Sequence, residues 1–415
     1  VRRVIEKLKS GTNIDELLIV TFTEAAAREM KERIQVALQQ SVNEESDPER
    51  RQHFVKQLSL LPMAQISTLH SFCLAVIRRY YYLIGIDPVF RLLTDETEQI
   101  LLKEEVWEEL RDQKYEEGTE VFYRLTENFV NDRSDEALTN VVMDLHRFAQ
   151  ANPSPEVWLE TLAKQYEHSD DLSEHPLFAK YIAPIYLAQL QSAANQLQRS
   201  IEQVSGQKDF SKLADMLEND YAQVAFLLQT FKDNQLTVFY QALGNVSFGR
   251  FPTFRKEEQK IISVPIKEQR DELKGQIGEM QKSFAYPPEK ILMLMTQAQP
   301  LVQEMGQLTL AFMENLKQRK KDKGVLEFND LEHYALEILS GSNQTGSEAS
   351  TYYRQQFKEV LVDEYQDVNR LQEAILSWVR TPDDENGNQF MVGDVKQSIY
   401  AFRSADPTLF IDQYL

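Results

Sequence analysis

Two adjacent carboxylates follow one of the short apolar runs in the sequence. The run Glu359 to Asp363 (EVLVD) continues with Glu364, Gln366 and Asp367 in the string DEYQD. Such a pair suits a hard cation and a water molecule, because one group can ligate Mg²⁺, usually through coordinated water, while the other acts as a base close to a phosphate. Acids at strand ends also cap helices, but the wider DEYQD string favours the cation and the water.

Phosphate-binding groups and aromatic rings follow a second apolar run, Gln389 to Gly393 (QFMVG). Gln397 and Arg403 can reach a phosphate, and Tyr400 and Phe402 place two rings with one residue between them. Alternating rings beside basic residues form a stacking platform for unpaired bases. Packing in a core is the alternative for either ring alone.

Two further apolar runs, Glu16 to Thr21 (ELLIVT) and Ala64 to Thr68 (AQIST), end in polar groups. The side chains at or just beyond their ends are Thr21, Phe22, Thr23, Thr68, His70 and Ser71. Ligands of an open α/β sheet bind outside the carboxyl ends of its strands, so four parallel neighbouring runs would face all these groups into one cleft. Taken alone, His70 and Cys73 also fit a core.

The elements that must position these groups are the four runs and the helices between them. Each run is near-continuously apolar over about five residues, which is typical of strands buried on both faces of a parallel sheet. Thr23 can cap a helix that extends through Leu38, and His70 to Tyr82 and Leu371 to Val379 read as helices that follow strands. The predicted fold class is therefore α/β.

A different stretch, roughly Leu92 to Lys323, separates the two β/α pieces. It is almost entirely helix-like, as in Asp95 to Asp112, Tyr181 to Val204 and Lys267 to Met280, and it contains no convincing strand. One α/β domain interrupted by a helical insertion explains this pattern. Two unrelated α/β domains would have about two strands each, too few for a stable sheet.

Composition limits the class of protein. The 415 residues are 42% hydrophobic and include one cysteine, which excludes a disulfide framework or a cysteine-rich metal site and favours a cytosolic protein. No run approaches the roughly 18 apolar residues of a membrane-spanning helix. The net charge of −20 argues against a general polyanion binder. A protein that binds a single polyanionic chain in a local groove need not be basic overall, however. Basic spots occur at Arg78 and Arg79, Arg250 to Lys260 and Lys317 to Lys323. For any one spot alone, a solvated helix face is the favoured explanation.

Four strings, in the order TFTEAAAREMKERI, STLHSFC, VDEYQD and GDVKQSIYAFRSAD, resemble successive motifs of superfamily 1 helicases of the UvrD/Rep/RecB type. Three more, YYYLIGIDPVFRLLTDETE, GVLEFNDLEHYALEIL and FRSADPTLF, look like the AddA (RexA) family of subunits of bacterial ATP-dependent helicase-nucleases. The resemblance covers both β/α pieces well and the helical stretch loosely.

The resemblance implies roles in ATP hydrolysis. Asp363 would hold the Mg²⁺ of the bound ATP, and Glu364 would polarise the attacking water. Gln397 would sense the γ-phosphate, and Arg403 would couple that region to DNA.

It also implies a DNA site. The residues that would contact the strand are Thr21, Phe22, Thr23, Thr68, His70 and Ser71. Tyr400 and Phe402 would stack on bases during stepping; the second ring is often Trp in UvrD-like members, which would weaken its stacking here. Gln366 and Asp367 would tie the nucleotide site to neighbouring motifs.

The resemblance further implies a RecA-like P-loop NTPase domain 1A in two parts, residues 1–91 and 324–415, and a helical insertion domain 1B, residues 92–323. The G-x-x-x-x-G-K-[ST] loop, the second RecA-like domain and the nuclease domain of the family have no counterpart in the sequence. We therefore expect a fragment that begins inside a longer protein and has negligible ATPase activity alone.

The parent protein would be an ATP-dependent helicase coupled to a nuclease, acting on double-strand break ends in recombinational repair in the cytoplasm. Its partners would be single-stranded and double-stranded DNA ends and an AddB/RexB-type subunit. Two alternatives are a UvrD/Rep/PcrA-type helicase without a nuclease and a non-catalytic helicase-like scaffold that binds DNA.

Overall fold

A computed structural model describes residues 1–129, 135–382, 387–397, 405–406 and 408–412. The chain folds into two compact units. The first holds residues 1–159 and 305–415, and the second holds residues 160–304. Among the helices of the described segments, none combines the length and the apolar character needed to cross a membrane.

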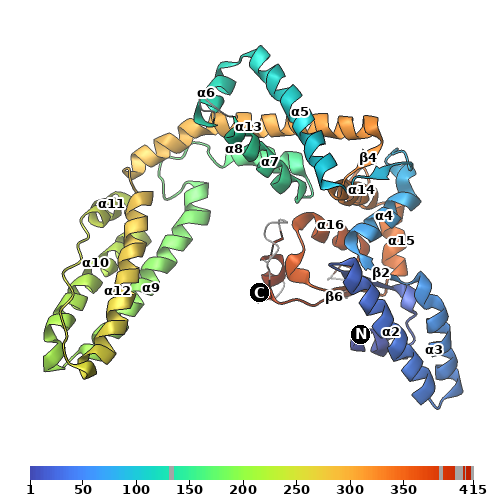
Figure 1. Ribbon diagram of the computed structural model, residues 1–415, viewed down its shortest axis with the longest axis horizontal. Helices are drawn as coiled ribbons and strands as arrows, with labels where there is room; N and C mark the ends of the chain where they lie inside the picture. The colour runs from blue at the N-terminus through green and yellow to red at the C-terminus, as the bar shows by residue number, and fades with distance from the viewer. Residues whose placement is uncertain (130–134, 383–386, 398–404, 407, 413–415) are drawn as a thin grey trace. The chain divides into compact units, whose positions relative to one another are not determined.

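The first unit contains a parallel sheet of four strands in the order β2-β1-β5-β6. Figure 1 labels its two edge strands, β2 and β6. Its strands are β1 (Leu17–Thr21), β2 (Gln65–Thr68), β5 (Glu359–Val362) and β6 (Gln389–Met391). All three pairings are parallel, with Ile19 opposite both Ile66 and Leu361. The four predicted strands and the parallel sheet are confirmed. Burial on both faces holds for the central strands β1 and β5, whereas the edge strands β2 and β6 are partly exposed.

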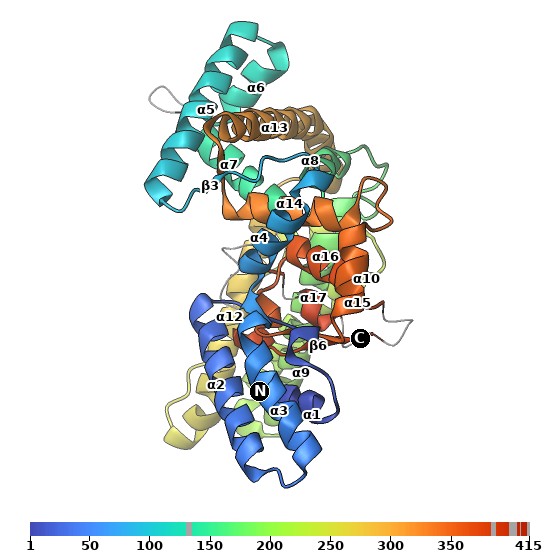
Figure 2. The ribbon, with the colours of Figure 1, turned by 90° about the vertical axis from the view of Figure 1, so that its right-hand side faces the viewer.

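Helices cover both faces of this sheet. Successive side chains of a strand point to opposite faces, so alternate residues of β1 pack against different helices. Leu18 and Val20 of β1 pack into a core with α4 (Leu69–Tyr80), α14 (Phe328–Ser340), α15 (Glu348–Gln356) and α16 (Arg370–Val379). Leu17 and Ile19 pack with α1 (Arg2–Lys9), α2 (Glu24–Glu44) and α3 (Pro48–Leu60). Helices α2 and α3 lie side by side (Figure 2).

A second, two-stranded parallel sheet was not predicted. It pairs β3 (Arg91–Leu92) with β4 (Val325–Leu326), at the two ends of the predicted insertion. The described residues between Leu93 and Gly324 contain helices and no strand. The helices of this stretch within the first unit are α5 (Glu96–Glu117), α6 (Glu120–Phe129) and α7 (Glu136–Gln150); α8 (Pro155–Lys164) and α13 (Pro288–Lys323) cross the unit boundaries.

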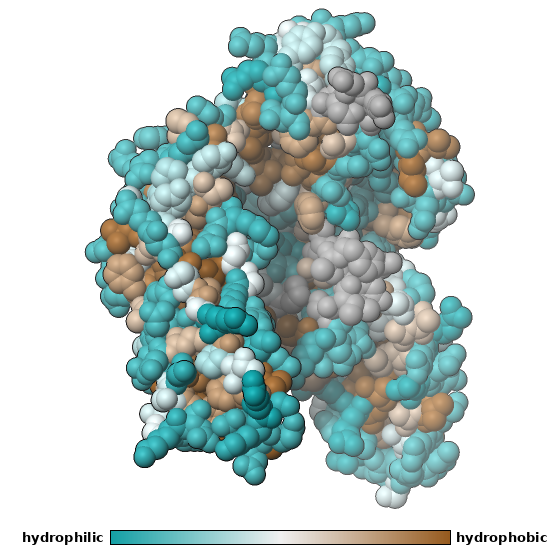
Figure 3. Space-filling view, turned by 60° about the vertical axis from the view of Figure 1, so that its left-hand side comes forward, coloured by the Kyte–Doolittle hydropathy of each residue, from teal (hydrophilic) through white to brown (hydrophobic). Residues whose placement is uncertain are grey.

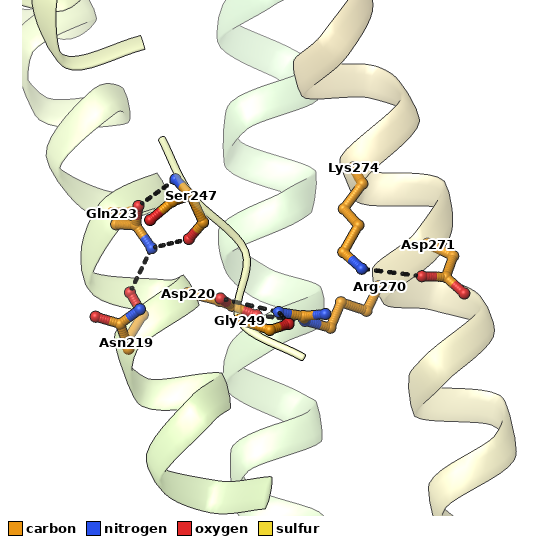
Figure 4. Close-up of polar contacts among 8 residues, drawn as sticks. All are labelled: Asn219, Asp220, Gln223, Ser247, Gly249, Arg270, Asp271 and Lys274. Carbon is orange, nitrogen blue, oxygen red and sulfur yellow. Dashed lines mark hydrogen bonds and ion pairs between the residues drawn. The ribbon is translucent and has the colours of Figure 1, made fainter. Parts of the chain in front are cut away.

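The second unit is built from α9 (Ala183–Val204), α10 (Ser211–Lys232), α11 (Leu236–Gly244) and α12 (Glu257–Ser283) around a core of its own. A fully buried ion pair joins two of these helices: Arg270 Nε of α12 donates to Asp220 Oδ2 of α10 at 2.5 Å (Figure 4). Arg270 Nη2 also donates to the carbonyl of Gly249 at 2.9 Å, so the same side chain fastens the loop before α12.

The face of the molecule in Figure 3 is mostly hydrophilic, with hydrophobic side chains scattered among polar ones. This is the ordinary surface of a globular protein.

Candidate functional site

The carboxyl edge of the four-stranded sheet opens into a cleft of about 550 Å³. Of the residues predicted from the sequence, those that line it are Thr21, Phe22, Thr68, His70, Asp363, Glu364 and Asp367. The sheet thus brings the carboxylates after β5 together with polar groups after β1 and β2. Thr23, Ser71 and Gln397 are described but do not line the cleft. Tyr400, Phe402 and Arg403 lie outside the described residues.

The acidic pair sits where β5 turns away from the sheet. Asp363 N still donates to the carbonyl of Val20 in β1 at 3.0 Å, and Glu364 then adopts a left-handed backbone with φ of 53°. This conformation is uncommon for a residue with a Cβ and often marks a functional position. Partial burial and the charge of Glu364 raise the pKa of Asp363. A cation bound between the two carboxylates would offset both the burial and the repulsion between their charges.

Gln366 connects this pair to the loop after β6. Its Nε2 donates to Glu364 Oε2 at 2.7 Å, and its Oε1 accepts from Asp394 N at 2.9 Å. Gly393 makes the approach possible, since a Cβ at that position would lie 2.4 Å from Gln366 Oε1. Close packing against Gln366 therefore requires a glycine at this position.

Gln397 is oriented by the same loop. Its backbone N and its Nε2 both donate to Asp394, to the carbonyl at 2.8 Å and to Oδ2 at 3.0 Å. Gln397 is itself exposed. A continuous set of hydrogen bonds therefore runs from Glu364 through Gln366 and Asp394 to Gln397.

Asp367 provides a test of whether a metal ion fits here. Its side chain is buried, and its Oδ1 has no hydrogen-bond partner among the described residues. Burial and the charge of Glu364 raise its pKa. No group of three or more His, Cys, Asp or Glu side chains in the described part of the chain could hold a metal by itself. Mg²⁺ usually takes one or two carboxylates from a protein and completes its shell with water and phosphate oxygens, so a site with few protein ligands is compatible with that ion.

The residues after β1 and β2 begin two helices. Thr23 caps α2, with Ala26 N donating to its Oγ1 at 3.1 Å, and Thr68 caps α4, with Ser71 N donating to its Oγ1 at 3.3 Å. The first N–H groups of a helix have no partner within it, and the helix dipole is positive there. Two helix starts at one sheet edge suit the phosphates of a nucleic-acid strand.

His70 is held by residues that were not predicted as functional. Its ring packs against Phe328 with centroids 5.1 Å apart, and its Nε2 faces Glu332. Gln372 Nε2 also donates to Glu332 Oε1, at 2.8 Å. Both Phe328 and Glu332 belong to the GVLEFNDLEHYALEIL string, which is the sequence signal that pointed to this region.

Comparisons with known proteins identify relatives of this chain. The family model of the UvrD/REP helicase N-terminal domain matches residues 1–414. An ATP-dependent helicase/nuclease A-subunit from Enterococcus faecalis is 52% identical over the whole of this chain and 33% of its own length. The proteins of the same name from Pediococcus pentosaceus and Bacillus cereus are 40% and 38% identical over the whole chain and 33% and 34% of their own lengths. The chain spans about a third of these curated relatives.

Proposed function

Since this chain belongs to the UvrD/REP helicase N-terminal domain family, as its motifs indicated, we propose that it is the ATP-dependent DNA helicase and translocase module of an AddA (RexA)-type helicase-nuclease. The complete protein would process double-strand break ends for recombinational repair. Its substrates would be single-stranded and double-stranded DNA ends, and its partner would be an AddB/RexB-type subunit. Its location would be the cytoplasm.

One observation carries the proposal: the acidic pair after β5 and the polar groups after β1 and β2 line the same cleft. An enzyme that moves along DNA at the expense of ATP must link a phosphate-transfer site to a strand-binding site. One sheet edge that holds both supplies the shortest link.

In the nucleotide half, Asp363 would ligate Mg²⁺ and Glu364 would orient the attacking water. Bound Mg²⁺ would neutralise charge on the β- and γ-phosphates of ATP. Gln397, already oriented by Asp394, would contact the γ-phosphate. Arg403 would couple the γ-phosphate region to DNA.

In the part of the cleft proposed to bind DNA, the DNA strand would lie over the N-terminal ends of α2 and α4. The residues proposed to contact it are Thr21, Phe22, Thr23, Thr68, His70 and Ser71. Tyr400 and Phe402 would stack on bases.

We also propose the division into a RecA-like P-loop NTPase domain 1A (1–91 and 324–415) and an all-helical insertion 1B (92–323). Its support is that every strand of the four-stranded sheet comes from the two outer segments. The described part of the middle segment is helical beyond β3.

The test is Glu364→Gln in the full-length protein with its partner. The substitution keeps the size of the side chain but removes the carboxylate that orients water, so DNA-stimulated ATP hydrolysis should fall at least about 100-fold, with DNA affinity within about twofold. Glu116→Gln, at an exposed position of α5, is the matched control and should change neither quantity.

Unchanged ATP hydrolysis in Glu364→Gln would favour a non-catalytic scaffold. If the wild-type complex unwinds linear DNA but does not degrade it, the UvrD/Rep/PcrA-type alternative is correct instead.

A further inference from the structure

The carboxylate of Glu24 bridges two of the hydroxyl groups proposed to meet DNA. Thr68 Oγ1 donates to Glu24 Oε1 at 2.8 Å, and Ser71 Oγ donates to the same oxygen at 2.7 Å. Glu24 is the first residue of α2, whereas Thr68 and Ser71 belong to the start of α4. The hydrogen bonds from Ser71 and Thr68 lower the pKa of Glu24, so the carboxylate is charged at neutral pH.

These contacts use the protons that a phosphate would need. A serine or threonine hydroxyl has one hydrogen to donate. Ser71 donates its hydrogen to Glu24, and Thr68 has two acceptors in reach, Glu24 Oε1 at 2.8 Å and Ser71 Oγ at 3.1 Å. The remaining lone pairs of Thr68 and Ser71 would repel an anionic oxygen. Glu24 itself is exposed, so an approaching strand meets a negative charge at this point.

We propose that Glu24 occupies the position of a DNA phosphate oxygen, and that single-stranded DNA must displace it to bind Thr68 and Ser71. This inference rests on the proposed function and adds a residue that sets the strength of strand binding. A translocating enzyme has to release each phosphate that it has bound, and a competing carboxylate at the contact favours that release.

The displaced carboxylate has another partner on its own helix. Arg28 lies four residues along α2, the spacing at which a glutamate and an arginine pair on a helix surface. Arg28 and His70 are close enough to lower the pKa of Glu24. In the described structure Glu24 bonds to the hydroxyls and forms no ion pair within 4 Å. The structure shows Glu24 with the hydroxyls, and Arg28 is the partner that Glu24 would take once DNA displaces it.

The test measures binding of a fluorescent oligo(dT) strand to the full-length protein with its partner, without ATP. Glu24→Gln keeps the hydrogen-bond acceptor and removes the charge. It should tighten binding about fivefold, the size of one like-charge contact in water, and the gain should shrink at high salt. Glu29→Gln is the matched control on the same helix, where Glu29 is exposed and paired with Arg33; it should change affinity less than twofold.

Equal or weaker binding by Glu24→Gln, with an unchanged melting temperature, would overturn the inference and leave Glu24 as a brace between two helices. His70→Ala separates this failure from failure of the proposed function. If His70→Ala weakens binding while Glu24→Gln does not tighten it, only the role of Glu24 is wrong. If neither variant changes affinity, the proposed DNA interface is wrong as well.

Discussion

The imidazole Nε2 of His70 lies 3.1 Å from the carboxylate of Glu332, whose side chain is only 2% exposed. Because Gln372 donates to the same carboxylate, Glu332 joins α4, α14 and α16 in the wall of the cleft. Among the described residues, no lysine or arginine forms an ion pair with it. A buried carboxylate is costly unless it is hydrogen-bonded, so Glu332 depends on His70 and Gln372, and they depend on it.

Replacing Glu332 with Ala should therefore destabilise the protein by about 1–3 kcal/mol, since two half-buried donors, His70 and Gln372, lose a charged acceptor. The DNA concentration for half-maximal ATPase stimulation should rise severalfold, because His70 loses its orientation. Glu332→Gln retains an acceptor oxygen and should recover most of both losses. Denaturant melts and DNA titrations of the full-length protein measure the two effects; equal losses in both variants would mean that the charge matters and the hydrogen bonds do not.

Gly393→Ala should lower the ATPase rate. The new Cβ would lie 2.4 Å from Gln366 Oε1, which breaks the hydrogen bond to Asp394 and releases Gln397. The control is Gly278→Ala in α12, where a Cβ meets nothing within 4 Å and the change should stabilise the helix by about 0.5–1 kcal/mol. Steady-state ATP hydrolysis of the two variants decides the matter: similar rates would show that the Gln366 contact is dispensable.

The buried pair of Arg270 and Asp220 gives a test of stability in the second unit. Losing one partner leaves a charge buried without compensation, so Arg270→Leu or Asp220→Leu should each cost about 3–5 kcal/mol. The double variant should cost less than the sum, because no buried charge remains. Lys274→Ala removes a partly exposed pair with Asp271 and should cost less than about 1 kcal/mol. Urea unfolding supplies all four values, and additive losses would contradict the coupling.

Acid should destabilise the first unit through His146. Burial and the charge of Lys103 lower the pKa of His146 to about 3, whereas an unfolded chain titrates near 6.5. Between these values only the unfolded state binds the proton, so stability falls as the pH falls, by about 2 kcal/mol between pH 7 and pH 5. His146→Gln should lose that part of the pH dependence in thermal melts.

The control for this experiment is His168→Gln, at a side chain that is 70% exposed, and it should keep the wild-type pH dependence. Burial also lowers the pKa values of His175 and His333, but both titrate in every variant and cancel in the comparison. If His146→Gln loses as much stability between pH 7 and pH 5 as the wild type does, His146 is not the source of the acid sensitivity.

The sheet could be predicted from sequence because its signals are local. Runs such as ELLIVT and EVLVD carry their own apolar pattern, and Thr23 caps α2 through a contact three residues away. The meeting of Glu24 with Thr68, or of His70 with Glu332, could not be predicted in this way. Those contacts depend on how distant helices pack, and a single glutamate on an exposed helix start or a helix interior gives no sign of its partner.

The short strands β3 and β4 were not predicted, because their pairing also depends on distant parts of the chain. Each is two residues long, too short for a period of two to register, and each finds its partner only in the folded chain. Gly393 ends the QFMVG run, but the need for a glycine there depends on Gln366, which follows another strand.

The position of β1 in the sheet has a consequence for how the protein is made. β1 pairs with β2, which the ribosome produces soon afterwards, and with β5, which it produces roughly 340 residues later, on the order of tens of seconds at usual rates of synthesis. Throughout that interval one edge of an apolar strand has no partner, and such edges promote aggregation. Chaperones that cover this edge during synthesis should therefore raise the yield of folded protein.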